Sequence, residues 1–194
     1  MFCSIRYAER PFFIHDELRK QAKTLESRHL LFVINPISGD KDKGQLKQQI
    51  ADWAKGQAVT YDLFMTSAER CVERLSAKLR EKDYDAVIAA GGDGTLNVVA
   101  QVVRVLKLST AIGILPLGSA NGMAKELEIP ESVQESLEVI AQFNTRTIDA
   151  IFVNQQHLCL HIGDIGLNAA VVKGFEEDDS RGMRSEERRV GKEC

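Results

Sequence analysis

Cysteine is scarce in this sequence, and its cysteines stand far from one another. They are Cys3, Cys71, Cys159 and Cys194, and no two of them form a Cys-x-x-Cys pair. This spacing indicates neither a zinc site nor a framework of disulfides. A reducing compartment fits such a chain best, so we expect a cytoplasmic protein.

Long apolar segments and a net basic charge are also missing. Charged residues such as Arg6, Glu9 and Asp16 interrupt the N-terminal stretch, so it has no apolar segment of the signal-peptide kind. No later stretch approaches the ~20 apolar residues of a membrane span. The net charge of -3 provides no general field for nucleic acid. We therefore expect no nucleic-acid partner, no transmembrane segment, and a protein that is soluble or at most peripheral to a membrane.

Residues 184–194, with the sequence RSEERRVGKEC, differ in kind from the rest of the chain. They resemble the translated read-through of a sequencing adapter and are excluded from fold reasoning. The alternative is a genuine charged helix. The chain, with 194 residues of which 44% are hydrophobic, is long enough for one buried domain and the beginning of another.

From His29 onward, β-branched apolar runs alternate with longer amphipathic segments, which predicts an α/β fold with a Rossmann-like parallel sheet. Two capping boxes are expected to start helices, one at Thr66 with Glu69 and one at Ser132 with Glu135. The predicted strands are residues 30–34, 59–64, 86–90 and 111–115, and the predicted helices are 43–55, the segment after Thr66, 96–106, 119–127 and the segment after Ser132.

The alternation of strands and helices ends near Asn144. Beyond it, two strands over 148–153 and 158–162 are predicted to flank a turn at Asn154 and Gln155. We therefore expect one lobe over residues 29–144 and the start of an incomplete β-rich second lobe over 145–183. Residues 1–28, with a predicted helix from Asp16 to Leu25, form an extension without an assigned role.

Ligands of open parallel sheets bind beyond the carboxyl ends of the strands. The loops expected there are small, polar or rich in glycine, and they are residues 35–39, 65–67, 91–95 and 116–122. The loop around Gly91, Gly92 and Gly94 is the most informative, because residues without a side chain let a ligand approach the main chain. Its amide groups and the following helix N-terminus are suited to phosphate oxygens.

Asp93 stands in the middle of this loop. A carboxylate repels phosphate unless a cation or a hydroxyl donor lies between them, so Asp93 indicates Mg²⁺ or an acceptor hydroxyl. Thr95 is expected to cap the following helix or to donate to a phosphate.

Two other phosphate motifs are excluded by spacing. Gly113 and Gly118 have the separation of a P-loop, but Ser119 follows where that loop requires lysine. Asn97 stands where a dinucleotide fingerprint requires its third glycine or alanine, which disfavours a Rossmann dehydrogenase.

Three segments occur in a characteristic order: Asn35-Pro36-x-Ser38-Gly39, Gly91-Gly92-Asp93-Gly94-Thr95-Leu96-Asn97 and Leu115-Pro116-Leu117-Gly118-Ser119-Ala120-Asn121. Together they resemble the motif set of the diacylglycerol kinase catalytic domain, which sphingosine kinases and bacterial lipid kinases share. The similarity extends from about Leu30 to Phe175. Two positions depart from the pattern, because Gly122 and Asn168 stand where aspartate is frequent.

The resemblance implies an ATP-dependent lipid kinase, in which a lipid hydroxyl, of diacylglycerol or a related acceptor, attacks the γ-phosphate at a membrane surface. It also implies Mg²⁺ at Asp93, a catalytic role for Asp93, and a homodimer as one option. The carboxylate that activates the acceptor would lie in the distal second lobe, beyond this sequence, so we expect the fragment itself to be inactive. The implied ATP contacts are Asn35, Ser38, Thr66, Gly91, Gly92, Asp93, Gly94, Thr95, Leu96, Asn97 and Ser119.

Two alternatives stay open. The first is an NAD kinase-like phosphotransferase, which the segment from Ser119 to Asn121 disfavours. The second is a nucleotide-binding module without catalysis.

Overall fold

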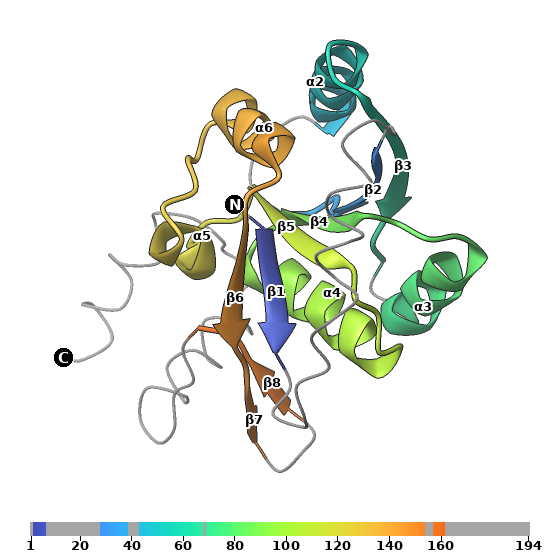
Figure 1. Ribbon diagram of the computed structural model, residues 1–194, viewed down its shortest axis with the longest axis vertical. Coiled ribbons are helices and arrows are strands. Elements are labelled where there is room, and N and C mark those ends of the chain that lie inside the picture. The colour runs from blue at the N-terminus through green and yellow to red at the C-terminus, as the bar shows by residue number, and fades with distance from the viewer. Residues whose placement is uncertain (1, 7–27, 39–42, 68, 154–156, 162–194) are drawn as a thin grey trace, which may run out of the picture. The chain divides into compact units, whose positions relative to one another are not determined.

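The computed structural model describes residues 2–6, 28–38, 43–67, 69–153 and 157–161 (Figure 1). The predicted helix from Asp16 to Leu25, most of the predicted second lobe and the adapter-like tail lie outside these residues. The described residues up to Leu160 belong to one compact unit.

The centre of this unit is a sheet of six strands in the order β3-β2-β4-β5-β1-β6. The strands β3, β2, β4 and β5 are mutually parallel, which confirms the predicted α/β class. Strand β1 runs antiparallel to β5 and parallel to β6. The bounds are β1 (Phe2–Arg6), β2 (Arg28–Ile34), β3 (Val59–Met65), β4 (Ala86–Gly91), β5 (Ala111–Pro116) and β6 (Thr145–Asp149).

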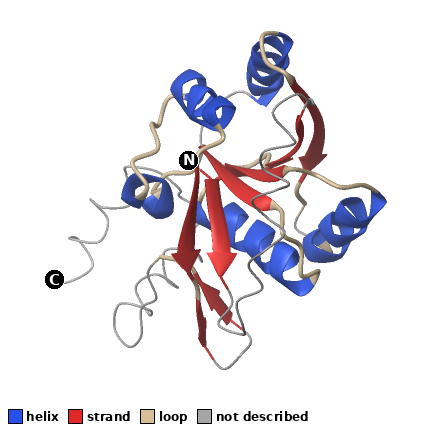
Figure 2. Cartoon of the chain, in the orientation of Figure 1, coloured by secondary structure: helices blue, strands red, loops and turns tan. Residues whose placement is uncertain are grey.

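Helices cover both faces of the sheet, as Figure 2 shows. Helices α3 (Cys71–Glu81), α4 (Asp93–Val105) and α5 (Gly122–Glu126) pack on one face, and α2 (Lys43–Lys55) and α6 (Val133–Gln142) pack on the other. Side chains of a strand alternate between the two faces. In β2, Leu31 and Val33 therefore join the first core, whereas Phe32 joins the second, and all three are fully buried.

The segment after residue 144 differs from the prediction. The expected strand over 148–153 is divided into β6, which joins the main sheet, and β7 (Ile151–Val153), which forms an antiparallel hairpin with β8 (His157–Cys159). The partner of β6 is β1, an N-terminal strand that was not predicted. The lobe boundary near Asn144 stays a prediction, because residues beyond 161 lie outside the described part of the chain.

Several predicted helix starts are wrong. Helix α3 begins at Cys71 and not after a Thr66 cap, because the Thr66 amide still donates to the Ile34 carbonyl oxygen at 2.9 Å. Helix α5 begins at Gly122 and not at Ser119. Ser132 does occupy the N-cap position of α6, but its side chain makes no capping hydrogen bond.

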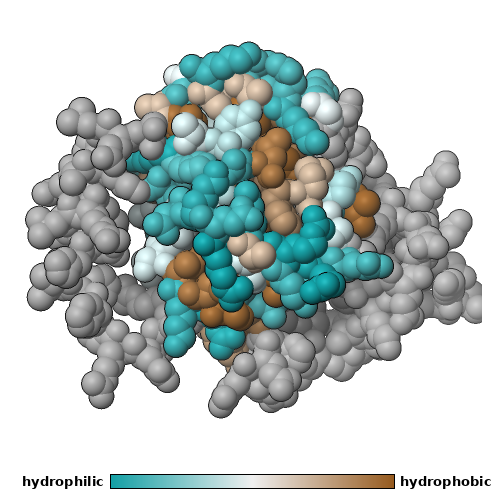
Figure 3. Space-filling model, turned by 90° about the vertical axis from the view of Figure 1, so that its right-hand side faces the viewer, coloured by the Kyte–Doolittle hydropathy of each residue, from teal (hydrophilic) through white to brown (hydrophobic). Residues whose placement is uncertain are grey.

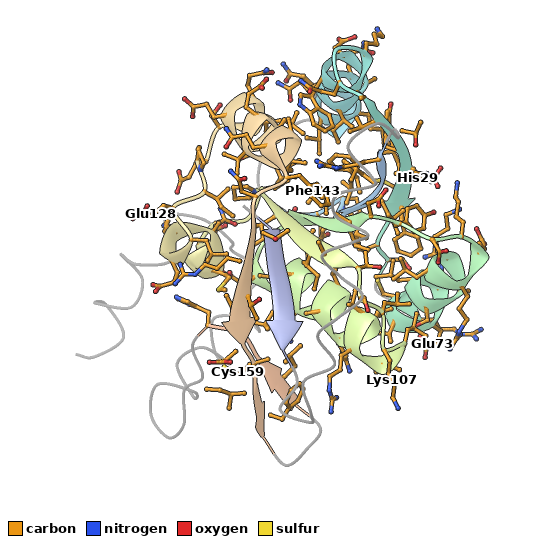
Figure 4. All side chains as sticks on the ribbon, in the orientation of Figure 1. His29, Glu73, Lys107, Glu128, Phe143 and Cys159 are labelled. Carbon is orange, nitrogen blue, oxygen red and sulfur yellow. The ribbon has the colours of Figure 1, made fainter. Side chains whose placement is uncertain are left out.

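Helices α4 and α5 each end in a hydrogen-bonded turn of the same type. After α4, the Lys107 amide donates to the Arg104 carbonyl at 2.9 Å and the Leu108 amide donates to the Val103 carbonyl at 3.0 Å. This is the Schellman pattern, which needs a left-handed residue after the C-cap. Lys107 has φ 53° and Glu128, in the corresponding turn after α5, has φ 55°. Both residues are labelled in Figure 4.

A polar cluster joins the sheet to the loop before β4. The Asp62 carboxylate accepts a hydrogen bond from the Tyr84 hydroxyl at 2.7 Å and pairs with Lys82 at 2.5 Å and with the His29 ring at 3.3 Å. Hydrogen bonds from Lys82 and Tyr84 lower the pKa of Asp62 to about 2. Burial, together with the bond to Asp62, raises the pKa of Tyr84 above its usual range.

The first prediction concerns Lys107. We expect Lys107→Gly to raise the free energy of unfolding by about 0.5–1 kcal/mol, because glycine adopts the left-handed conformation without the steric cost of a Cβ. Urea denaturation measures this change. Lys107→Ala, which keeps the Cβ, is the matched control, and an equal gain in that variant would contradict the explanation.

The second prediction concerns the Asp62 cluster. A carboxyl whose folded pKa lies below its unfolded value stabilises the fold above the unfolded pKa, and this contribution is lost as the pH falls through the folded value. Asp62→Asn should therefore cost about 1–2 kcal/mol at neutral pH. The difference from the unaltered protein should shrink as the pH falls from about 4 toward about 2.

Urea denaturation of both proteins across this pH range measures the effect. Asp83→Asn, at an exposed aspartate of the loop before β4 that carries Lys82 and Tyr84, is the control. A difference that does not depend on pH would contradict the assignment.

Candidate functional site

The parallel strands end together at one edge of the sheet. Ile34 pairs with Met65 on one side and with Ala90 on the other, and Ala90 pairs with Leu115. The loops that follow these strands therefore begin side by side, as the sequence predicted. Each is attached to its neighbour: the Asn35 amide donates to the Ala90 carbonyl at 3.1 Å, and the Leu117 amide donates to the Gly91 carbonyl at 2.9 Å.

The loop after β2 is a closed turn. The Asn35 side-chain oxygen accepts the Ile37 amide at 3.1 Å, and the Ser38 hydroxyl donates to the Asn35 carbonyl at 3.0 Å. Asn35 and Ser38 are half-buried, whereas Ile37 at the tip is 70% exposed. Both predicted site residues of this loop thus also shape the turn itself.

The loop after β3 borders an open depression lined by Ser67, Glu69, Arg70 and Arg74. Arg74 donates to the Ser67 hydroxyl oxygen at 2.5 Å and lies 5.3 Å from the centre of the Phe64 ring. Thr66, the residue predicted here, is half-buried just before this depression. Sequence reasoning missed the two arginines, although two basic residues beside a loop at the carboxyl edge were a visible signal.

The glycine loop, residues Gly91–Gly94, joins β4 to α4. Gly91 is buried, and a Cβ there would lie 2.7 Å from the Thr95 Cβ. Gly92 is the N-cap of α4, so the predicted cap role of Thr95 is wrong. A Cβ on Gly94 would meet no atom within 4 Å. The first amides of the helix have no intrahelical acceptor, which suits this end of α4 to negative charge.

The predicted residues of this segment divide into two groups. The side chains of Thr95 and Leu96 are buried, at 6% and 5% exposure, and Leu96 belongs to the core. Asp93, Gly94 and Asn97 are exposed. A ligand at this edge can therefore meet the Asp93 and Asn97 side chains and the Gly94 main chain.

The Asp93 carboxylate connects the glycine loop to α5. One of its oxygens accepts the Gly122 amide at 2.9 Å, and the other accepts the Met123 amide at 3.1 Å. Negative charge at a helix N-terminus is stabilising. Each carboxylate oxygen has a second lone pair, so the exposed side of Asp93 can still accept a donor or a cation.

The β5–α5 turn, residues Leu117–Asn121, is held by a second polar contact. The Asn121 side chain accepts the Gly118 amide at 2.9 Å and donates to the Gly118 carbonyl at 2.7 Å. Asn121 is 7% exposed and has φ 51°. Ser119 and Ala120 lie exposed at the tip of the turn. Sequence reasoning included Asn121 in a motif without giving it a role.

The glycine loop and the β5–α5 turn are in main-chain contact. A Cβ on Gly118 would lie 2.5 Å from the Gly92 Cα, and one on Gly92 would lie 3.3 Å from the Gly118 Cα. The two loops therefore form one surface of main-chain amides, the Ser119 hydroxyl and the Asp93 carboxylate. Within the described residues, no three or more His, Cys, Asp or Glu side chains gather as a metal site.

This fold, an open and mainly parallel sheet with helices on both faces and its loops at the carboxyl edge, places the chain in the class of α/β domains whose ligands generally bind beyond that edge. The family model of the diacylglycerol kinase catalytic domain matches residues 29–153. The chain belongs to this family, which confirms the resemblance seen in the three motifs.

Individual relatives agree with this placement. The chain is 28% identical over 128 residues to a diacylglycerol kinase of Staphylococcus aureus, covering 64% of this chain and 40% of that protein. It is 27% identical over 146 residues to a probable lipid kinase, YegS-like, of Stenotrophomonas maltophilia, covering 72% of this chain and 46% of that protein. The chain thus spans less than half the length of these relatives.

A solved structure shows the same fold. The crystal structure of a diacylglycerol kinase from Bacillus anthracis strain Sterne superimposes with a TM-score of 0.54 at 23% identity, covering 63% of this chain and 42% of that one.

On the face drawn in Figure 3, hydrophilic residues are interspersed with small apolar groups. Among the helices of the described ranges, none has the length and apolar character to cross a bilayer.

The third prediction concerns the contact between Gly92 and Gly118. We expect Gly118→Ala to cost about 1–3 kcal/mol of stability, because its methyl group must displace the main chain at Gly92. Gly94→Ala is the matched control and should change stability by less than about 0.5 kcal/mol, since its methyl group enters open space. Chemical denaturation compares the two variants. An equal cost in both would show that the close approach is not the cause.

Proposed function

We propose that the chain carries the nucleotide-binding lobe of an ATP-dependent lipid kinase, which transfers the γ-phosphate of ATP to a lipid hydroxyl. Membership of the diacylglycerol kinase catalytic domain family supports the class of reaction. The observation that carries the proposal for this chain is the glycine loop at the start of α4. The space beside Gly94 is empty of protein atoms, and the Asp93 side chain is exposed.

In this proposal the phosphates of ATP lie over the glycine loop. The amides of Asp93 and Gly94 at the start of α4 donate to the phosphate oxygens, and the Ser119 hydroxyl contacts them from the neighbouring turn. Asn35, Ser38 and Thr66 contribute from the loops after β2 and β3. Phosphoryl transfer depends mainly on alignment and charge neutralisation, and these groups provide both.

Mg²⁺ is the cofactor that this site suits. Protein-bound Mg²⁺ is commonly held by one or two carboxylates together with substrate phosphates and water. Asp93 provides one carboxylate whose outer lone pairs are free of the two amide bonds made to α5. The cation would neutralise charge that develops on the transferred phosphate.

The acceptor is proposed to be diacylglycerol or a related lipid, met at the cytoplasmic surface of a membrane. The group that activates its hydroxyl would belong to the second lobe, of which residues 145–183 are the proposed start. We therefore expect the 194 residues to bind MgATP weakly and to transfer little phosphate.

The fourth prediction tests this function. In a chain extended through a complete second lobe, Asp93→Asn should reduce lipid phosphorylation at least about a hundredfold, because the charge that holds the cation is lost. It should lower stability by only about 0.5–1.5 kcal/mol, because the remaining amide oxygen still accepts one of the two α5 amides.

Assays with labelled ATP and a panel of acceptors measure this activity: diacylglycerol, a sphingoid base, phosphatidylglycerol and NAD. Transfer to NAD alone would favour the NAD kinase alternative. ATP binding without transfer in the extended chain would favour the non-catalytic module. Full lipid kinase activity in Asp93→Asn would contradict the proposed role of Asp93 in holding the cation.

A further inference from the structure

The position of the β5–α5 turn is determined from two sides. On one side, the Leu117 amide is bonded to the Gly91 carbonyl and the Gly118 main chain lies against Gly92. On the other side, the Asp93 carboxylate holds the first amides of α5. The exposed tip with Ser119 lies between these attachments.

Asn121 closes the turn in a way that few side chains reproduce. Its carboxamide offers an acceptor and a donor together, and both are used on the same residue, Gly118. Aspartate would keep the acceptor and lose the donor, and alanine would lose both. Asparagine also adopts the left-handed backbone seen at φ 51° and ψ 47° more readily than most residues.

Burial increases the effect of this contact. Asn121 is 7% exposed, so removal of its side chain leaves the polar groups of Gly118 without their partner in a largely buried place. Gly118 is also the residue that touches Gly92. A change at Asn121 is therefore transmitted to the glycine loop through one intervening residue.

We propose that Asn121 is a positioning residue for nucleotide binding. Together with Asp93 it holds the β5–α5 turn against the glycine loop, so that the Ser119 hydroxyl and the glycine-loop amides face the same polyphosphate of a nucleoside triphosphate. This inference rests on the proposed function. It adds to that proposal a residue that touches no ligand and acts by fixing the two loops as one unit.

The fifth prediction tests this inference with Asn121→Gly, which removes both side-chain bonds and retains a residue suited to positive φ. Amide hydrogen exchange over residues 117–123 and calorimetric titration with MgATP are both carried out on the 194-residue chain. We expect the amide exchange rate in this segment to increase at least about fivefold. The dissociation constant of MgATP should also rise at least about fivefold.

Two variants serve as controls. Asn144→Gly makes the same replacement at an exposed asparagine remote in sequence from these loops, and neither measurement should change. Ser119→Ala removes a hydroxyl proposed to contact the phosphate, so it should weaken MgATP binding and leave exchange over 117–123 unchanged. Asn121→Ser replaces Asn121→Gly if circular dichroism shows that the glycine variant is unfolded.

The outcomes separate this inference from the proposed function. Faster exchange in Asn121→Gly with unchanged MgATP affinity overturns the positioning role. Unchanged exchange shows that the Asn121 side chain does not fix the β5–α5 turn, which also overturns the proposal. If the unaltered chain does not bind MgATP in the millimolar range, the nucleotide-binding function fails and the positioning role fails with it. In that case, exchange still decides whether Asn121 fixes the turn.

Discussion

The contact between the main chains of Gly92 and Gly118 is the constraint on which the candidate site depends. It brings the loop after β4 and the loop after β5 to a distance that no residue with a Cβ at position 118 could allow without movement. The in-register ends of β4 and β5 make this approach possible, and the bonds of Asp93 and Asn121 maintain it. A small displacement of either strand would therefore alter the shape of both loops together.

Much of the fold could be predicted because its signal is local. The bounds of α2, and those of the four parallel strands to within two residues, followed from apolar periodicity, since both faces of β2 and β4 are buried. The helix starts were less predictable. A residue can cap a helix only where the preceding strand has already ended. The Thr66 amide is still hydrogen-bonded to the Ile34 carbonyl of the sheet, so α3 begins later than the capping motif predicts. The strand β1 could not be predicted, because its partners lie more than a hundred positions away.

The candidate site was predictable as a set of residues and not as a geometry. The motifs identified the four loops, and the sheet places those loops at one edge. The family resemblance included Leu96 among the ATP contacts and could not show that its side chain enters the core while Asn97 stays exposed. Nor could it show that Asp93 is bonded to Gly122 and Met123, because side-chain contacts between separate loops leave no periodic signal in the chain.

Strand β1 has a consequence for the order of folding. It pairs with Ile112 of β5 and with all five residues of β6, which stand more than a hundred positions later in the chain. Contacts between distant parts of a chain carry a large loop-closure entropy and form slowly. The parallel core of β2, β4 and β5 can form earlier, and β1 and β6 then join it together. Until β1 joins, the edge of β5 that β1 covers therefore stays open to other strands.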